Sequence, residues 1–476
     1  MNWVRNLIGW LNRLIQSGEI RKWTILGILI GIIAGVGSLA IYYSFEFFSF
    51  LLIQSLAHQT IPVPGSNYGN GNFVLPAFHT VPSAAELLIP VSTTLGGLIS
   101  GFLVYRFAPE TEGHGTDAVI DAFHNKGGKI RRRVPIVKLL TSAITIGSGG
   151  SAGREGPTAQ IAAGFGSFVS DVFHLSERDR RLAMAAGIGA GIGSIFSAPL
   201  GGALLSTEIL YRRDFETEAL VPSLIASVTG YAIFGYFFNY QPLFTIPAGI
   251  TLGFYHPTSI AVYLIVGIVA GLVGIGFVNS FYAISGIFKK MNRVSKYLRP
   301  AIGGLLVGII AMYFPEVMGL GYGWVQVLFY NPYFFPLWLI LALVIAKIVA
   351  TSLTIGSGGS GGVFAPGMVI GAFLGGAMGL ILNPYFPQLT ILEITIVTMI
   401  AFFGGISKAP ISVIIMGTEM TQSYALFLPL MIATLTAYFV SGKHGIYRSQ
   451  VDNRSDSPAH YEEYRQNLRK RKHEYF

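Results

Sequence analysis

The chain has 476 residues, of which 52% are apolar and only 12% are charged, and its mean hydropathy is +0.58. A soluble globular chain carries about 25% charged residues, so this composition excludes an ordinary soluble domain and indicates a membrane protein. The net charge of +9 comes from basic stretches that flank apolar segments, and anionic lipid headgroups account for it without a nucleic-acid partner.

The first segment, residues 1–23, places most of its apolar side chains near one helical face. This pattern predicts an amphipathic helix that lies at the membrane interface. A cleaved signal peptide is the weaker alternative, because Asn6, Asn12 and Arg13 interrupt the apolar part and no small-x-small site precedes Thr24.

Further along the chain, five apolar runs reach or approach the roughly 20 residues that span a bilayer as a helix. Lysine and arginine gather before the first run, in short connections and in the tail, whereas residues 58–82 and 239–257 contain none. The positive-inside rule therefore predicts that both termini are cytoplasmic. We expect an all-α, multi-pass integral membrane protein. The five runs are Thr24–Ile53, Leu87–Phe107, Tyr263–Phe288, Phe335–Ile355 and Leu389–Phe403.

An internal duplication is visible in two glycine- and serine-rich runs. Gly147-Ser-Gly-Gly-Ser-Ala-Gly-Arg-Glu-Gly-Pro157 recurs in altered form as Gly356-Ser-Gly-Gly-Ser-Gly-Gly-Val-Phe-Ala-Pro366, at an offset of 209 residues. The same offset pairs Lys138 with Lys347, so the match extends beyond the glycines. We place the two membrane repeats at residues 24–240 and 241–447.

Both runs break apolar segments at corresponding positions. Broken helices are tolerated in a membrane only inside protein or beside a water-filled cavity, and paired breaks indicate a binding site at the repeat interface, as in secondary transporters. Helix packing through small residues is one alternative, but it does not account for long runs repeated in register. A nucleotide-binding loop is another, but neither run ends in Gly-Lys-Ser/Thr.

Helix starts of this kind attract anions, because they present free N–H groups and the positive end of the helix dipole. One terminus supplies about 0.3–2 kcal/mol, less than the several kcal/mol that desolvating an ion costs, so several termini must converge. Gly113-His114-Gly115 precedes a third candidate helix start. Glu155 lies at one such start, so its carboxylate can occupy the anion's donors and yield when protonated or displaced. Alternatively, it caps the helix or pairs with Arg154.

These motifs resemble those of the CLC family of chloride channels and proton/chloride antiporters. Gly153-Arg-Glu-Gly-Pro157 resembles the family's gating-glutamate motif, and Gly362-Val-Phe-Ala-Pro366 resembles its second anion-binding motif. The similarity covers most of residues 24–447. It implies a CLC-like fold of inverted-topology repeats with broken helices, and a homodimer with one anion path per subunit.

Carried onto this chain, the resemblance implies that Glu155 is the external gate and that Val363 and Phe364 donate backbone N–H groups to a central anion. Tyr447 would donate its hydroxyl to the same anion, although a tyrosine there can also anchor the last helix at the interface. The anion-binding residues we expect are His114, Gly115, Arg154, Gly156, Val363, Phe364 and Tyr447.

Two positions depart from the family pattern. His114 replaces the serine of the first anion motif; its imidazole N–H can donate to an anion, or it can point away and leave the backbone to bind. Ile209 stands ten residues after Pro199, where coupled antiporters commonly have a proton-transfer glutamate. Glu208 is a possible proton relay, or equally a buried structural acid matched by Glu419.

The tail, residues 448–476, is too short for the CBS domains that many relatives append, and we expect a short cytoplasmic helix or an unstructured segment. We predict CLC-type chloride transport gated by Glu155, channel-like or weakly coupled because Ile209 cannot carry a proton. The alternatives are a proton-coupled chloride antiporter of the same fold and, more remotely, a membrane-embedded enzyme. The expected partners are chloride and other small anions, protons in the coupled case, membrane lipids and a second copy of the chain.

Neither a metal site nor a cofactor is expected. Cysteine is absent, which excludes disulfides, thiolate metal sites and cysteine catalysis, and the nine histidines form no spaced ligand cluster. An enzyme would also need a nucleophile–base pair or a metal cluster inside the spans, and the one strongly marked intramembrane acid, Glu155, lies among anion donors instead.

Overall fold

The computed structural model describes residues 15, 18–64, 86–250, 252–254 and 256–461. Most of the predicted interfacial segment lies outside the described residues. Its last part belongs to the first membrane helix, which begins at Glu19. The described chain is α-helical, and its only strand-like features are three isolated bridges.

The described α-helices form two sets of eight in chain order. The first set comprises α2 (Glu19–Ser49), α3 (Ile89–Phe107), α4 (Thr116–Asn125), α5 (Val134–Gly147), α6 (Glu155–Val172), α7 (Glu177–Ile195), α8 (Pro199–Glu208) and α9 (Leu220–Phe237). The second set comprises α10 (Ser259–Lys290), α11 (Arg299–Tyr313), α12 (Tyr322–Tyr330), α13 (Leu337–Gly356), α14 (Phe364–Leu382), α15 (Ile391–Ser407), α16 (Pro410–Thr421) and α17 (Phe427–Ser441).

Short turns connect some of these helices. A π-helical turn follows α2 at Phe50–Leu56. The 3₁₀ turns are Glu86–Leu88, Pro109–Thr111, Thr217–Ala219, Pro315–Val317, Tyr424–Leu426, Arg454–Asp456 and Pro458–His460.

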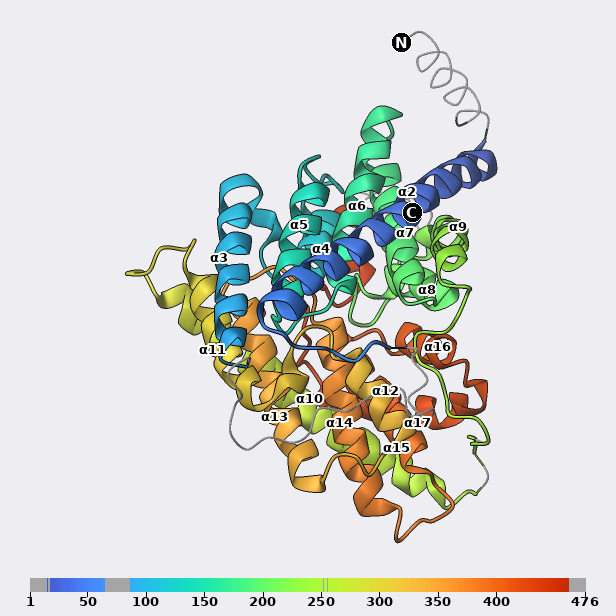
Figure 1. The fold of residues 1–476 in the computed structure, drawn as a ribbon. Helices are drawn as coiled ribbons and strands as arrows, with labels where there is room; N and C mark the ends of the chain where they lie inside the picture. Colours follow the sequence, from blue (N-terminus) through green and yellow to red (C-terminus); the bar gives the residue numbers. More distant parts are fainter. Residues whose placement is uncertain (1–14, 16–17, 65–85, 251, 255, 462–476) are drawn as a thin grey trace.

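The two sets occupy different parts of the molecule. In Figure 1 most of the first set, coloured blue to green, lies above the second set, coloured yellow to red, and α11 lies beside α3. The boundary predicted between residues 240 and 241 falls in the connection between α9 and α10.

Within the described part of the chain, seven helical segments are long and apolar enough to cross a membrane. They contain three of the five apolar runs in full and Phe335–Ile355 except for its first two residues. The fifth run, Leu389–Phe403, overlaps α15, which has 17 residues and is shorter than a full span. The multi-pass, all-α class predicted from the sequence is confirmed. The seven segments are Glu19–Leu56, Glu86–Phe107, Thr217–Phe237, Ser259–Lys290, Leu337–Gly356, Phe364–Leu382 and Tyr424–Ser441.

Small residues bring neighbouring helices into contact. A Cβ atom on Gly166 of α6 would lie 2.2 Å from the carbonyl oxygen of Ala183, and one on Gly187 of α7 would lie 2.3 Å from that of Ala162. Neither contact leaves room for a side chain, so these glycines serve helix packing. The packing interpretation therefore holds for glycines inside helices, while the two glycine-serine runs lie between helices.

The helices α8 and α16 cap each other across the two repeats. Glu208 accepts hydrogen bonds from the N–H groups of Ile411 (3.2 Å) and Ser412 (2.7 Å) at the start of α16. Glu419 does the same for Leu200 (3.1 Å) and Gly201 (2.7 Å) at the start of α8. A carboxylate at a helix N-terminus satisfies free donors and complements the helix dipole. Glu208 therefore acts as a buried structural acid, which is one of the two roles that the sequence analysis considered for it.

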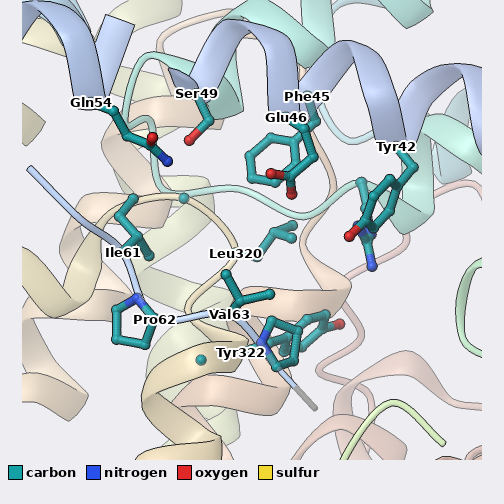
Figure 2. Close-up of a pocket in the computed structure, with 14 residues that line it drawn as sticks. Tyr42, Phe45, Glu46, Ser49, Gln54, Ile61, Pro62, Val63, Leu320 and Tyr322 are labelled. Carbon is teal, nitrogen blue, oxygen red and sulfur yellow. The ribbon is translucent and has the colours of Figure 1, made fainter. Parts of the chain in front are cut away.

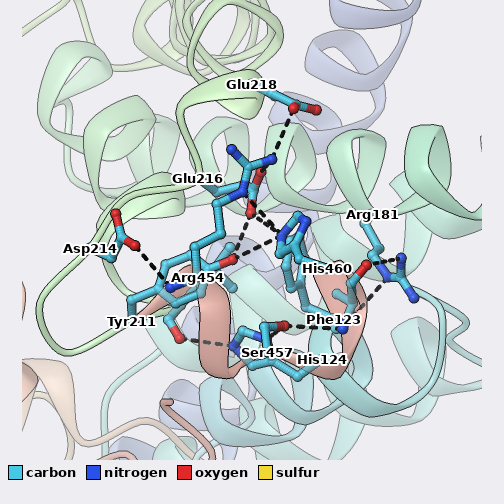
Figure 3. Close-up of polar contacts among 12 residues, drawn as sticks. Phe123, His124, Arg181, Tyr211, Asp214, Glu216, Glu218, Arg454, Ser457 and His460 are labelled. Carbon is cyan, nitrogen blue, oxygen red and sulfur yellow. Dashed lines mark hydrogen bonds and ion pairs between the residues drawn. The ribbon is translucent and has the colours of Figure 1, made fainter. Parts of the chain in front are cut away.

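The described part of the tail contains two 3₁₀ turns and packs against the protein, whereas a short cytoplasmic helix or an unstructured segment was expected. Val451 forms a bridge with Tyr211, and Arg212 donates its N–H to the carbonyl of Val451 (2.9 Å). Further on, the buried carboxylate of Glu216 accepts a hydrogen bond from the Tyr211 hydroxyl (2.6 Å) and pairs with Arg454 (3.2 Å). Figure 3 shows this network. The tail adopts this conformation because buried polar groups of the first repeat need its partners.

The tail also holds the end of α4. The ring nitrogens of His124 lie 2.7 Å from the hydroxyl of Ser457 and 2.9 Å from the carbonyl oxygen of Leu210 (Figure 3). Burial lowers the pKa of His124 below its ordinary value, although the Leu210 carbonyl favours the protonated ring. The neutral ring therefore donates to Leu210 and accepts from Ser457, which fixes the end of the helix that begins beside His114.

Candidate anion-binding site

Three loops meet at the centre of the molecule and are joined by backbone hydrogen bonds. Gly113, before α4, donates to Gly359 (3.1 Å) and accepts from Gly361 (3.2 Å), both in the run before α14. Gly153, before α6, exchanges two hydrogen bonds with Gly362 at 2.7 and 2.6 Å. The three helix starts identified in the sequence are thereby brought together.

The convergence concentrates unpaired backbone donors. The helices α4, α6 and α14 begin at Thr116, Glu155 and Phe364, within three residues of the bonded glycines. The first N–H groups of a helix have no acceptor within that helix, so the donors of three helices face a common region. Close approach requires glycine, because a Cβ atom on Gly156 would lie 2.2 Å from the carbonyl oxygen of His114.

Two buried lysines hold the loops of this frame. Lys138 donates to the carbonyls of Thr111 (3.0 Å) and Gly113 (2.8 Å), before α4. Lys347 donates to those of Val317 (2.8 Å) and Gly319 (3.1 Å), before α12. The sequence paired the two lysines without giving them a role, and the structure places both as donors to loop carbonyls.

A fourth helix start, which the sequence analysis missed, supplies a partner for Glu155. The hydroxyl of Tyr322, the first residue of α12, donates to Oε1 of Glu155 at 2.9 Å, and both side chains are only 1% exposed. The signal was present, because Pro109-Glu110 and Gly113-His114-Gly115 recur as Pro315-Glu316 and Gly319-Leu320-Gly321 at an offset of 206 residues. The gating candidate therefore lies between the two repeats.

Arg154 does not form the ion pair with Glu155 that was one alternative for that residue, as judged over the described residues. Its guanidinium lies over the ring of Tyr42, 4.8 Å from the centroid, and the side chain is 4% exposed. Its Nε atom has no hydrogen-bond partner in the described part of the chain. Arg154 is thus a buried cation at the start of α6 with donors to spare.

His114 and Tyr447 are neighbours on the other side of the frame. Their ring centroids lie 5.4 Å apart, and the side chain of Thr116 lies beside Tyr447. The N–H of Asp117 donates to Nδ1 of His114 at 3.4 Å, so in the neutral ring the hydrogen is on Nε2. This arrangement leaves one imidazole N–H as a donor in place of the serine hydroxyl of the family motif.

An inner cavity of about 420 Å³ reaches His114 and Gly115. Its wall carries both signs of charge, with Lys289 and Arg448 among the cations. Because the tail begins at this wall, the cavity opens on the face of the protein that carries the tail. The carboxylates of the wall are Glu110, Glu112, Asp117 and Asp121.

An outer cavity of about 60 Å³ lies on the Tyr322 side of Glu155, at the end of the frame away from His114. It is lined by Tyr42, Glu46, Arg154 and Tyr322, together with residues 61–64 (Figure 2). The two cavities have no wall residue in common. Glu155 lines neither cavity, but its carboxylate is bonded to Tyr322 in the wall of the outer one.

The remaining predicted residues pack in the core around the site. Phe364 lies against Phe403 (3.8 Å between centroids) and Phe196 (4.5 Å), and Val363 is buried beside it. These side chains anchor the start of α14 and leave its backbone N–H groups for a ligand. Ile209 is also buried in the core, so no titratable side chain occupies that position. No cluster suited to a metal ion is found among the described residues.

Sequence comparisons identify related proteins. Residues 96–442 match the family model described as voltage gated chloride channel. A putative chloride channel protein ClcB-like from Ralstonia nicotianae is 33% identical over 390 residues, which cover 80% of this chain and 88% of the relative. The H(+)/Cl(−) exchange transporter ClcA from Yersinia pseudotuberculosis is 30% identical over 381 residues, which cover 77% of this chain and 79% of the relative.

Solved structures share the fold. A slow cyanobacterial Cl−/H+ antiporter matches with a TM-score of 0.73 and 24% identity, covering 89% of this chain and 95% of that one. A CLC-type fluoride/proton antiporter matches with a TM-score of 0.73 and 22% identity, covering 91% and 98%. At these identities the likeness concerns the fold alone.

Proposed function

Because the chain belongs to the voltage-gated chloride channel (CLC) family, whose members are channels and transporters rather than enzymes, we propose that it conducts chloride through the site between the two cavities. The observation that carries the proposal is the Glu155 carboxylate, which lies at the start of α6 where three helix N-termini converge. Such a carboxylate competes with an anion for the same backbone donors. Glu155 is then the gate, and its protonation or displacement admits the anion.

The path uses donors from both repeats. An anion from the inner cavity first meets Nε2–H of His114, which lines that cavity, and then the hydroxyl of Tyr447, whose ring lies next to His114. It then reaches the N–H groups that begin α14, at Val363 and Phe364, and those of α6 near Gly156. Several such donors are needed, because one helix terminus does not offset the desolvation of an ion. Arg154 adds a positive charge on the outer side of the gate.

Weak or absent proton coupling follows from Ile209, which has no titratable group where a coupled transporter commonly has a glutamate. A proton crossing an apolar stretch without a carrier needs a water wire or a buried charge. The buried charge costs at least several kcal/mol, which corresponds to about three decades in rate. Glu208, the candidate relay, would have to release the N–H groups of α16 before it could move a proton.

A proton-coupled antiporter is the second candidate. It is favoured by the relatives whose names describe H(+)/Cl(−) exchange, which cover more than three quarters of this chain. In that case Glu155 would carry the proton on the outer side, and a water wire or Glu208 would supply it from the inner cavity.

Simultaneous recording of chloride and pH separates the two candidates. Liposomes containing the protein, with a chloride gradient and a valinomycin clamp, should show anion flux without uphill proton movement. A fixed proton-to-chloride ratio that survives changes of voltage would overturn the channel-like proposal. Loss of that ratio in Glu208→Gln, but not in its matched control Glu419→Gln, would identify Glu208 as the relay.

The remaining features of the proposal concern topology and assembly. We place both termini in the cytoplasm, with the repeats at residues 24–240 and 241–447 and a cytoplasmic tail from residue 448. The assembly is a homodimer with one path per subunit. The reciprocal caps place the start of each of the helices α8 and α16 at the end of the other, so the exposed Leu200 of α8 and Ile411 of α16 lie at opposite ends of the pair and offer apolar contacts for the second copy.

A further inference from the structure

The outer cavity contains an acidic side chain, Glu46, and a basic one, Arg154, that do not bond to each other. Tyr42 and Glu46 are one turn apart on α2, so both reach the cavity from the same helix face. Figure 2 shows the Glu46 carboxylate pointing into the cavity, with Tyr42 beside it and Tyr322 on the opposite side. Arg154 enters from the start of α6. The cavity therefore adjoins the gate through Tyr322, the partner of Glu155.

The guanidinium of Arg154 has N–H donors available for a hydrogen-bond acceptor from a ligand. A guanidinium has five N–H donors and no acceptor, and contact with the face of Tyr42 stabilises its charge without using these donors in hydrogen bonds. The side chain is more than nine-tenths buried, and its Nε atom has no partner in the described part of the chain. A buried unpaired donor is unfavourable, so a ligand that accepts from Arg154 removes this penalty.

Glu46 places a negative charge in the same cavity, opposite in sign to that of Arg154. Its carboxylate interacts electrostatically with Arg154, but no ion pair within 4.0 Å joins the two among the described residues. The cavity volume of about 60 Å³ exceeds the roughly 10–15 Å³ that one water requires. A partly hydrated small anion fits next to Arg154, and the charge of Glu46 repels it.

We propose that the outer cavity is a staging site for a small monovalent anion, in which Arg154 supplies the donors and Glu46 limits the occupancy. The inference rests on the proposed anion path and adds a site outside the gate. An anion held by Arg154 is adjacent to Tyr322, so it can follow Glu155 into the central site when the carboxylate leaves. Glu46 prevents the anion from being held too tightly to move on, since conduction requires weak sites in series.

The test compares the two faces of the membrane. In oriented bilayers, Glu46→Gln should lower the half-saturating chloride concentration at the outer face by about threefold to tenfold, because a repelling charge is removed. Arg154→Gln should raise it, and Glu46→Asp, which keeps the charge, should stay near the wild type. Glu112→Gln, in the wall of the inner cavity, is the matched control and should alter only the inner-face dependence. An unchanged outer-face value in both Glu46→Gln and Arg154→Gln would overturn the proposal.

Bromide diffraction tests binding independently of transport. Crystals of the Glu46→Gln protein soaked in bromide should show an anomalous peak beside Arg154, stronger than in the wild type. A peak near His114 and Tyr447 with none in the outer cavity of either protein would reject the staging site while supporting the proposed path. Bromide beside Arg154 in a folded protein that carries no anion flux would instead support the site and count against the proposed function.

Discussion

The loops before α4 and α12 occupy equivalent positions in the two repeats, and one buried lysine holds each of them. Gly115 and Gly321, which precede the two helices, have φ values of +83° and +84°, a conformation that favours glycine. The starts of α6 and α14 are likewise joined by the paired bonds of Gly153 and Gly362. The backbone of the site is thus nearly the same in both repeats.

The side chains on this frame differ. Glu155, the first residue of α6, corresponds to Phe364, the first residue of α14, at the offset of 209 residues. His114 corresponds to Leu320 at the offset of 206 residues. At these two positions the first repeat carries the titratable groups, whereas the second carries apolar anchors and supplies the hydroxyls of Tyr322 and Tyr447. The comparison teaches that duplication built the frame, while the gating chemistry belongs to one repeat.

The largest expected effect comes from removing the charge of the gate. Glu155→Gln keeps the shape of the side chain but cannot lose a proton, so anion flux should vary by less than about twofold between pH 5 and pH 7.5. The wild type should be activated by acid. Flux from reconstituted liposomes provides the measurement, and Phe364→Leu, at the equivalent position, is the control and should retain the acid response. Acid activation that persists in Glu155→Gln would remove Glu155 from the gating role.

A second prediction tests the symmetry of the frame. Lys138→Met and Lys347→Met each remove two hydrogen bonds to loop carbonyls, and each should reduce stability by about 2–4 kcal/mol. Equivalent geometry predicts losses that agree within about 1 kcal/mol. The stability losses of the two variants are measured by thermal unfolding in detergent, with the remaining folded protein detected by size-exclusion chromatography. A large loss in only one variant would show that the two repeats do not share the same frame.

A third prediction concerns the contact between the repeats at the gate. Tyr322→Phe removes the hydroxyl that donates to Glu155, a hydrogen bond to a charged group worth about 1.5–3 kcal/mol. The carboxylate should then leave its position more readily, so flux at neutral pH should rise by tenfold or more by the conversion of about 1.4 kcal/mol per decade. Flux at acid pH should change little, because the protonated gate is already displaced. An equal rise at both pH values would indicate a wider path instead of a released gate.

The smallest expected effect is on selectivity. His114→Ser restores the hydroxyl of the family motif, so the relative permeation of chloride, nitrate and fluoride should shift by about twofold to fivefold. Leu320→Val, at the equivalent position of the second repeat, is the control and should leave these ratios unchanged. Identical selectivity in His114→Ser and the wild type would mean that the imidazole does not contact the anion.

Much of the fold could be predicted from the sequence. The breaks at Gly147–Pro157 and Gly356–Pro366 can be read directly from the amino-acid sequence. The helix starts that follow them are indicated by the glycine and proline pattern. Hydropathy was sufficient for most spans because lipid demands long apolar helices. It was less reliable for α15, which is enclosed by other helices and does not need to reach across a bilayer by itself.

The contacts between distant segments could not be predicted. Tyr322 meets Glu155 across 167 residues of sequence, and a tyrosine in an apolar helix carries no local sign of such a bond. Glu46 appeared as one polar residue in an apolar run, and only the fold places it opposite Arg154. The contacts of the tail could not be predicted either, because its partners lie in the first repeat, far away in the sequence.

The exchange of caps between α8 and α16 has a consequence for biosynthesis. Glu208 leaves the ribosome about two hundred residues before its partner Ser412, as their separation of 204 residues shows. Until α16 is made, a carboxylate destined for burial has no donors, and the start of α8 lacks its own acceptor. The first repeat therefore cannot complete its folding alone, although chains usually fold from the N-terminal side during synthesis. A chain truncated before α16 would retain this unpaired charge, at a cost of several kcal/mol, and would be an evident substrate for membrane quality control.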